Sequence, residues 1–255
     1  MLVLALATAR RSCPELMDAV AASCRSLEWG TQDVSSLALA YAMCGRAAPA
    51  LFDALLTPRR ATNSTAAGLV QLLWACAILD YAAPSCAFSE ALAEALPLRW
   101  KEIESRDDSQ AKLHAVLLWL RFEQPAQTTL LRLLSGKEDA LKEAAARVRG
   151  GPSRSQAQLS DALTALGWVH EREHFSSDGL HVGVASLEAK TTFLFDGPFH
   201  YFTGPGGPVL DGRATFKRRL LATLGWTGLG VPCFAWDALA TKDAQKTYLQ
   251  NKLTR

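Results

Sequence analysis

Thr191-Thr-Phe-Leu-Phe-Asp-Gly-Pro-Phe-His200 is the stretch of this 255-residue sequence that decides the fold. Residues 191–195 are mostly β-branched or aromatic, which is typical of a short buried strand. Gly197-Pro198 ends that strand abruptly, because proline cannot donate a backbone hydrogen bond to a sheet. A carboxylate and an imidazole, Asp196 and His200, therefore lie near the end of a strand, where they could hold a metal or carry out acid–base chemistry.

The residues around this strand predict a small α/β domain. The expected elements are, in order, a helix at 155–166, strands at 179–185 and 191–195, a basic helix at 212–224, a strand at 228–232 and a helix at 236–253. This order is that of a small sheet flanked by helices.

The first half of the chain has a different periodicity. Apolar residues recur three and four positions apart and Ala and Leu dominate, which predicts helix throughout residues 1–148. Three similar stretches begin 33 and then 35 residues apart, and each is followed by a proline and a second helix. The stretches begin at Leu4, Leu37 and Leu72, the prolines are Pro14, Pro49 and Pro84, and a degenerate fourth unit spans 113–134. Helix pairs at this period predict an α-solenoid; the alternative is that Ala- and Leu-rich helices merely look alike.

Gly150-Gly-Pro152 ends a charged helix at 137–147 and is the expected domain boundary. We therefore expect a helical-repeat domain over residues 1–150 and an α/β domain over 151–255, with its core at about 180–254.

Composition narrows the functional classes. Hydrophobic residues make up 49% of the chain and charged residues 20%, with a net charge of +2, so any basic surface for nucleic acid must be local. The six cysteines form no C-x-x-C pair, so we expect neither a zinc site nor a disulfide framework, and a reducing compartment. No apolar run is long enough to span a membrane. No Arg-rich leader is apparent, so we expect the chain to begin inside a longer protein or to have lost a targeting segment.

Several motifs together resemble the RAP domain, an RNA-binding domain abundant in apicomplexans. They are Phe195-Asp-Gly-Pro-Phe-His200, Leu210-Asp-Gly-Arg-Ala-Thr-Phe-Lys-Arg-Arg-Leu-Leu221, Gly225-Trp226, Val231-Pro232, Trp236 and Tyr248-Leu-Gln-Asn-Lys-Leu253. The upstream helices resemble the repeats of FAST kinase-like proteins of mitochondria and of octotricopeptide-repeat proteins of organelles. The resemblance implies a mitochondrial or, alternatively, plastid protein that binds organellar mRNA or rRNA in RNA processing, stability or ribosome assembly. A structural protein of an organellar ribosome, in contact with ribosomal proteins, is an alternative.

The RAP domain is similar in fold to restriction-type endonucleases, which hold a divalent cation with acidic or histidine side chains on neighbouring strands. Asp196 and His200 would be the catalytic residues of such an endoribonuclease. The family's usual Asp on the preceding strand is replaced by Gly183, and its usual Glu two residues before the Asp is replaced by Leu194. One carboxylate is a poor ligand set for magnesium. We therefore expect no catalytic site, no metal site and no cofactor, and keep a metal-dependent endoribonuclease as an alternative.

Two further carboxylates, Asp178 and Glu188, would complete a metal site only if the strand register were shifted. Without a metal, Asp196 has two possible roles. It caps the turn by accepting backbone N–H bonds, with His200 bonded to it. Alternatively, the pair forms one wall of a pocket for an RNA end or backbone.

The basic helix offers the stronger case for RNA contact. Its cations lie next to a Gly/Pro loop at 204–208, although such a cluster is often only a solvated face. The expected RNA-binding residues are Asp196, His200, Arg213, Lys217, Arg218 and Arg219. Thr215 and Phe216 allow backbone or stacking contacts beside them. One or more of Phe199, Tyr201 and Phe202 could be exposed as a base-stacking platform, although core packing is the expectation for any single one of them.

Overall fold

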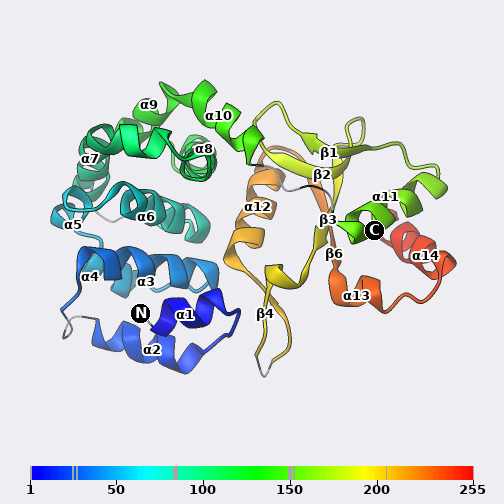
Figure 1. Cartoon of the computed structure of the whole chain (residues 1–255), viewed down its shortest axis with the longest axis horizontal. Helices are drawn as coiled ribbons and strands as arrows, with labels where there is room; N and C mark the ends of the chain where they lie inside the picture. The colour runs from blue at the N-terminus through cyan, green and yellow to red at the C-terminus, as the bar shows by residue number, and fades with distance from the viewer. Residues whose placement is uncertain are drawn as a thin grey trace. The chain divides into compact units, whose positions relative to one another are not determined.

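The computed structural model describes residues 2–24, 26, 28–82, 86–148, 151, 153–204 and 206–254. The chain forms two compact units, and each combines two separate segments (Figure 1). The helical unit consists of Met1–Val148 and Phe202–Lys217, and the sheet unit of Arg149–Tyr201 and Arg218–Arg255. The division between the units therefore falls inside one helix, between Lys217 and Arg218.

The first 148 residues are helical, as the periodicity predicts. The helices are α1 (Leu2–Thr8), α2 (Pro14–Ser23), α3 (Thr31–Met43), α4 (Pro49–Leu55), α5 (Pro58–Thr62), α6 (Ala66–Leu79), α7 (Cys86–Glu104), α8 (Asp107–Phe122), α9 (Thr128–Ser135) and α10 (Glu138–Arg147). Pro14 and Pro49 begin α2 and α4, where a missing backbone N–H costs nothing. Pro84, the third proline of the predicted repeat, lies outside the described residues.

These helices pack on their neighbours in alternation. Helix α3 contacts α1 and α6, α6 also contacts α8, and α7 contacts α9. Tyr41, Leu72 and Trp119, from α3, α6 and α8, are among the largest fully buried side chains. Such packing satisfies what a helical repeat would need, because each helix pair buries its apolar face against the next. A solenoid of true repeats stays a prediction.

The segment 202–217 is the second part of the helical unit. It contains the end of β4 (Tyr201–Phe202), all of β5 (Val209–Leu210) and the first half of α12 (Gly212–Thr223). Phe216 is 1% exposed and meets Trp74 edge to face at 5.4 Å between ring centroids. Phe216 is thus a core residue, and the expectation that it stacks on RNA is wrong. At Gly212 a side chain would overlap the carbonyl oxygen of Ala42, so only glycine fits there.

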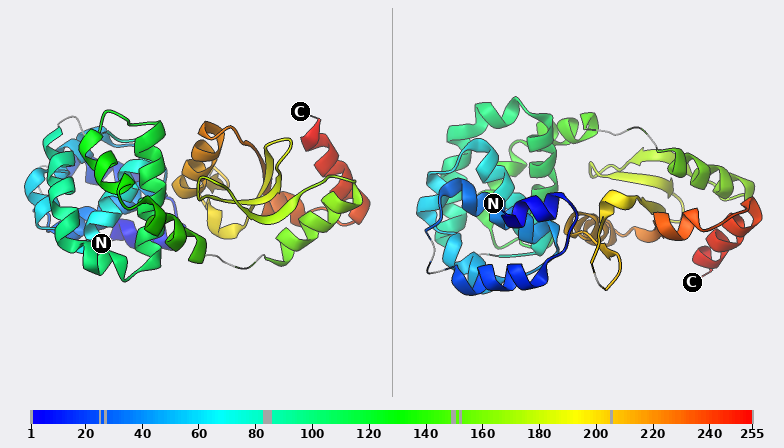
Figure 2. Two further views of the ribbon diagram at one scale, coloured as in Figure 1. Left: turned by 90° about the horizontal axis from the view of Figure 1, so that it is seen from above. Right: turned by 60° about the horizontal axis from the view of Figure 1, so that its bottom comes forward.

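The sheet unit is an α/β unit with a mixed sheet. Strands β1 (Glu171–Phe175), β2 (His181–Ser186), β3 (Thr191–Asp196) and β6 (Thr227–Pro232) lie in the order β1-β2-β3-β6. The first three strands are antiparallel, and β6 runs parallel to β3. Figure 2 shows this sheet between helices. Those helices are α11 (Arg154–Ala165), α13 (Cys233–Asp237), α14 (Lys242–Leu253) and the second half of α12.

Each face of the sheet has its own core. Helices α11, α13 and α14 cover one face, where Leu163, Trp236 and Leu249 pack with Phe193. Leu221 of α12 packs on the other face, in the cluster that contains Leu194. The sheet is therefore the middle layer of the unit, which positions the end of β3 between its helices.

Gly183 interrupts the alternation of β2. In a regular strand Val182 and Val184 would face the same side, yet they bury in the cores of opposite faces. The backbone of Gly183 has φ +87°, and the β1–β2 register shifts beside it. Position 183 therefore carries a β-bulge that requires glycine.

The elements predicted for this half are present, but the structure adds others. Strands β1, β4 and β5 were not expected. The helix expected over 236–253 is broken into α13 and α14, with Thr241 capping the second through the N–H of Ala244. Within the described part of the chain, none of the helices is long and apolar enough to cross a membrane.

Candidate nucleic-acid interface

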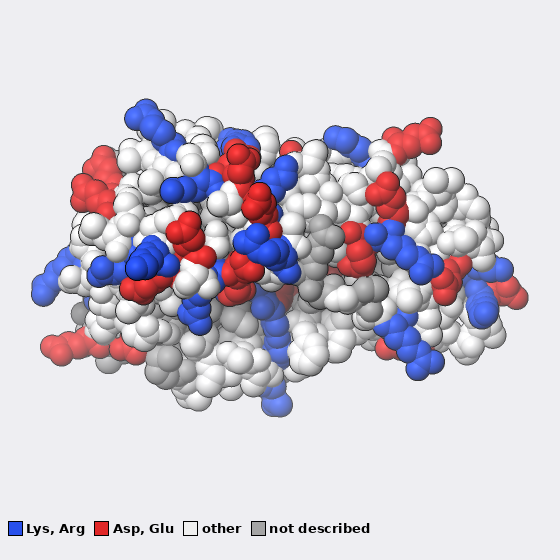
Figure 3. Space-filling view, turned by 45° about the horizontal axis from the view of Figure 1, so that its top comes forward, with Lys and Arg blue, Asp and Glu red and all other residues white. Residues whose placement is uncertain are grey.

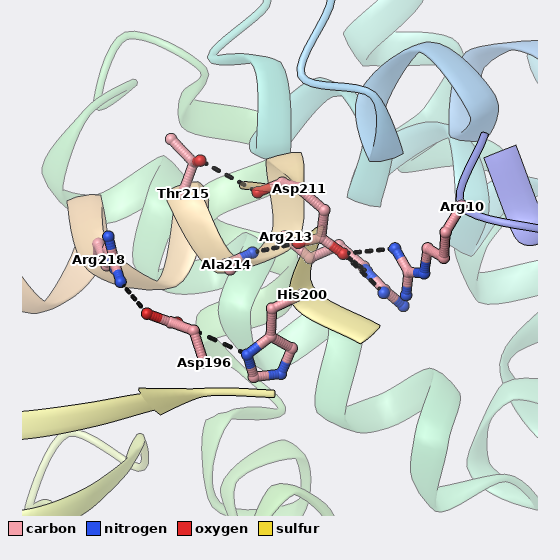
Figure 4. Close-up of polar contacts among 8 residues, drawn as sticks. All are labelled: Arg10, Asp196, His200, Asp211, Arg213, Ala214, Thr215 and Arg218. Atoms are coloured by element: carbon pink, nitrogen blue, oxygen red, sulfur yellow. Dashed lines mark hydrogen bonds and ion pairs between the residues drawn. The ribbon is translucent and has the colours of Figure 1, made fainter. Parts of the chain in front are cut away.

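Asp196 is the centre of a polar cluster in the sheet unit. It is the last residue of β3, and its side chain is 5% exposed. Its carboxylate forms an ion pair with Arg218 of α12 and lies 3.6 Å from Nδ1 of His200 (Figure 4). His200 is brought there by the 3₁₀ helix η1 (Pro198–His200), which the Gly197-Pro198 turn begins. The cluster thus joins a buried anion to a half-exposed imidazole and a half-exposed guanidinium.

Arg218 is held from two sides. Asp196 binds its Nη2, and strand β6 passes so close that a side chain at Gly230 would overlap the guanidinium. Gly230 therefore provides the space in which Arg218 lies. The side chain of Arg218 remains 35% exposed, so its remaining N–H donors can meet solvent or a ligand.

The negative charge of Asp196 helps to raise the pKa values of two tyrosines. Burial raises the pKa of Tyr201 to about 12, and the negative charge of Asp196 raises it as well. Burial and the charge of Asp196 also raise the pKa of Tyr248. Both phenols therefore stay protonated at neutral pH and add no negative charge to the cluster.

One exposed aromatic ring adjoins the cluster in sequence, and a second packs on the residue after His200. Phe199, between Pro198 and His200, is 73% exposed, and Phe234 of α13 is 50% exposed. Phe234 packs against Tyr201 at 5.3 Å between ring centroids. Of the three aromatics considered for base stacking, Phe199 is exposed while Tyr201 and Phe202 are buried. One ring after the turn is thus exposed, and core packing holds for the other two.

A second polar cluster, in the helical unit, surrounds Asp211. Its side chain is 1% exposed and binds Arg10 Nη1 and Arg213 Nη2, each at 2.7 Å (Figure 4). Asp211 also accepts the backbone N–H of Ala214 at 2.7 Å, which caps the start of α12. Sequence reasoning missed this role. An Asp just before a predicted helix could have signalled the cap, but nothing in the sequence signals Arg10, which lies 201 residues away.

The structure brings together some of the expected RNA-binding residues and not others. Asp196, His200 and Arg218 form the cluster in the sheet unit, whereas Arg213 belongs to the cluster around Asp211 in the helical unit. Lys217 and Arg219 are half-buried. Over one face of the helical unit, Figure 3 shows Lys and Arg interspersed with Asp and Glu, so charges of both signs are mixed on that face.

The residues at the expected metal-ligand positions have structural roles. Gly183 makes the bulge in β2, and Leu194 packs in a core. Glu188 lies in the turn before β3, at the opposite end of that strand from Asp196. Among the residues that the structure describes, no three His, Cys, Asp or Glu side chains are grouped so that they could hold a metal ion.

Comparison with known proteins assigns the region around these clusters. Residues 193–252 match the RAP domain family. The RAP domain-containing protein, chloroplastic, of Oryza sativa subsp. japonica is 30% identical over 101 residues, which make up 40% of this chain. The chain spans 15% of the length of that relative. The part of the chain that contains Asp196, Asp211 and α12 is therefore a RAP domain.

Proposed function

We propose that this chain is an organellar RNA-binding protein that grips single-stranded RNA through its RAP domain. The observation that carries the proposal is the cluster in which buried Asp196 pairs with Arg218 and His200, together with exposed Phe199, which precedes His200 in the sequence. A fixed guanidinium binds a phosphate with little loss of side-chain entropy. An exposed ring stacks on an unpaired base, which is how single-stranded RNA is commonly recognised.

The cluster favours binding over hydrolysis. Both oxygens of Asp196 face cationic or imidazole partners, and the two positions that would supply further carboxylates are Gly183 and Leu194. A hard divalent cation requires several oxygen ligands. In a restriction endonuclease-like fold, Asp196 and His200 would then serve to hold the RNA backbone, and an endoribonuclease is the alternative that the experiment below tests.

Helix α12 adds phosphate contacts. We include Arg213, Lys217 and Arg219 in the proposed RNA surface, since each is a partly exposed cation on a helix of the RAP domain. Each cation that neutralises a phosphate adds to the salt dependence of binding.

The cellular setting is proposed from resemblance. The resemblance of the first helices to the repeats of FAST kinase-like proteins favours a mitochondrion, and the rice relative, named as chloroplastic, favours a plastid. The RNA would be an organellar mRNA or rRNA, and the role its processing, stability or assembly into ribosomes. If the protein is instead a structural ribosomal component, it should stay with organellar ribosomes at high salt.

The decisive test replaces Phe199 by Ala and measures affinity for a fluorescent single-stranded RNA by anisotropy. We expect roughly 5- to 100-fold weaker binding, the worth of one base stack. Val169→Ala is the matched control, because Val169 is 83% exposed in the same unit and should leave affinity unchanged. Equal affinities for the two variants would refute the proposed site.

A cleavage assay tests the nuclease alternative. The wild-type protein and Asp196→Ala are incubated with RNA and magnesium or manganese. We expect intact RNA from both. Cleavage by the wild type that Asp196→Ala abolishes would show that the site is catalytic.

A further inference from the structure

A cavity of about 300 Å³ lies in the helical unit, whereas the cluster around Asp196 belongs to the sheet unit. Its lining comes from α3, α6, α8 and the first half of α12, all within the helical unit. The lining residues are Leu39, Met43, Trp74, Asp108, Ala111, Lys112 and Arg213. The volume is at the lower end of the range of about 300–1,000 Å³ that is usual for small-molecule sites.

One wall of the cavity is aromatic and rigid. Trp74 is half-buried, and Phe216 holds it edge to face at 5.4 Å with 77° between the ring planes. Leu39 and Met43 add apolar surface beside it. A fixed indole with apolar neighbours suits a flat aromatic ligand, because little side-chain freedom is lost on binding.

The polar part of the lining is mainly cationic. Arg213 uses Nε and Nη2 to bind Asp211, and its side chain is 39% exposed. Since a guanidinium has five N–H donors, others remain for a ligand. Lys112 pairs with Asp108 at 2.6 Å, but this pair is solvent-exposed and contributes little to stability, so its ammonium can turn to a phosphate at low cost.

We infer that this cavity binds one nucleotide, with its base against Trp74 and its phosphate between Arg213 and Lys112. The source of the nucleotide is single-stranded RNA held by the RAP domain, so the inference rests on the proposed function and adds a second contact to it. An aromatic wall beside two cations offers the two interactions that every nucleotide presents, a stacking face and a negative charge.

The first test adds a negative or a positive charge at one uncharged position of the lining. Ala111 is half-buried on α8, and Glu and Lys are both good helix formers, so Ala111→Glu and Ala111→Lys differ mainly in charge. We expect Ala111→Glu to weaken RNA binding roughly tenfold and Ala111→Lys to preserve or strengthen it. Thermal melting of both variants verifies that each is folded.

The second test separates stacking from charge. Trp74→Phe keeps an aromatic ring, and Trp74→Leu keeps apolar volume without one. We expect Trp74→Leu to weaken binding roughly 5- to 100-fold and Trp74→Phe much less. Ultraviolet crosslinking of bound RNA, followed by mass spectrometry, should recover the peptide that contains Trp74.

The outcomes distinguish this inference from the proposed function. If Phe199→Ala weakens RNA binding while the Ala111 and Trp74 variants bind like the wild type, the cavity assignment is overturned and the RAP-domain site stands. If the wild type binds no RNA but binds AMP or UMP, and Ala111→Glu weakens this, the source named here is wrong and the proposed function fails with it. Loss of RNA affinity in Ala111→Glu and Trp74→Leu, with a crosslink to Trp74, supports the inference.

Discussion

The RAP domain contains two Asp-Gly pairs, Asp196-Gly197 and Asp211-Gly212, that share their chemistry and differ in their surroundings. Both aspartate side chains are buried and both bind arginine. Asp211 is closed in: it caps α12 and binds Arg10, whose side chain is only 16% exposed. Asp196 instead faces His200, which is 47% exposed.

The glycines differ in the same sense. A side chain at Gly212 would overlap the backbone at Ala42, whereas one at Gly197 would meet no atom within 4 Å among the described residues. Burial and an arginine partner therefore do not by themselves mark a binding aspartate. Exposure of the arginine partners does not separate them either, since Arg213 at Asp211 is 39% exposed and Arg218 at Asp196 is 35% exposed. The open space beside the following glycine is what separates the proposed binding pair at 196–197 from the structural pair at 211–212.

The largest expected effect comes from removing the two aspartates. Asp211→Ala should lower the free energy of unfolding by about 3–5 kcal/mol, because it removes a cap and leaves Arg10, whose side chain is 16% exposed, without its partner. Asp196→Ala should cost about 1–2 kcal/mol, since water can solvate its half-exposed partners. Urea denaturation of both variants measures the difference. Equal losses would show that the two aspartates are equivalent.

Substitutions of the two glycines should follow the same order, with smaller losses of stability. Gly212→Ala should cost about 1–3 kcal/mol or more through overpacking at Ala42. Gly197→Ala is its matched control and should change stability by less than about 0.5 kcal/mol. Thermal melting compares the two, and an unchanged melting temperature for Gly212→Ala would contradict the close packing described here. If Gly197→Ala folds normally yet binds RNA less well, the open space at Gly197 is used by the ligand.

The smallest effects are those of alkaline pH. The pKa values of all four tyrosines are raised, with Tyr41 and Tyr201 at about 12 against an ordinary value of 10.0, chiefly because they are buried. Since the folded pKa exceeds the unfolded one, these phenols contribute stability that is complete below pH 10.0 and is lost as the pH rises toward about 12. Denaturation at increasing pH should show this loss.

The titration also tests the comparison of the two aspartates. Asp196→Asn should lower the pKa of Tyr201 and Tyr248, because the charge of Asp196 helps to raise both. Asp211→Asn should leave them unchanged. Phenolate absorbance measured during an alkaline titration distinguishes the variants. A shift of equal size in both would show that the charge of Asp196 does not specifically raise these pKa values.

The sequence predicted the parts of the fold that have strong local signals. Strands β2, β3 and β6 are rich in β-branched, aromatic or apolar residues and end at turns, and α12 ends two residues before Gly225, so each was expected near its observed place. Strand β1 was not, because Glu171-Arg-Glu-His-Phe175 is mostly charged and Glu173 has φ +52°, which breaks the alternation.

The candidate site was predictable only where its residues are close in sequence. Asp196 and His200 lie on either side of one turn, and their proximity follows from the Asp-Gly-Pro motif. Arg218 was expected as an RNA contact, but its pairing with Asp196 depends on how α12 packs on the sheet. The lining of the cavity beside Trp74 comes from four helices. Contacts of this kind require the tertiary fold, which no local pattern encodes.

The membership of residues 202–217 in the helical unit has a consequence for dissecting the protein. Buried Phe202 and Phe216 and tightly packed Gly212 find their cover in the first 148 residues. A fragment excised at residue 149 would contain the whole RAP match and yet present these side chains to water. We expect such a fragment to aggregate alone and to regain solubility when a fragment of residues 1–148 is supplied in trans, as in a complementation assay.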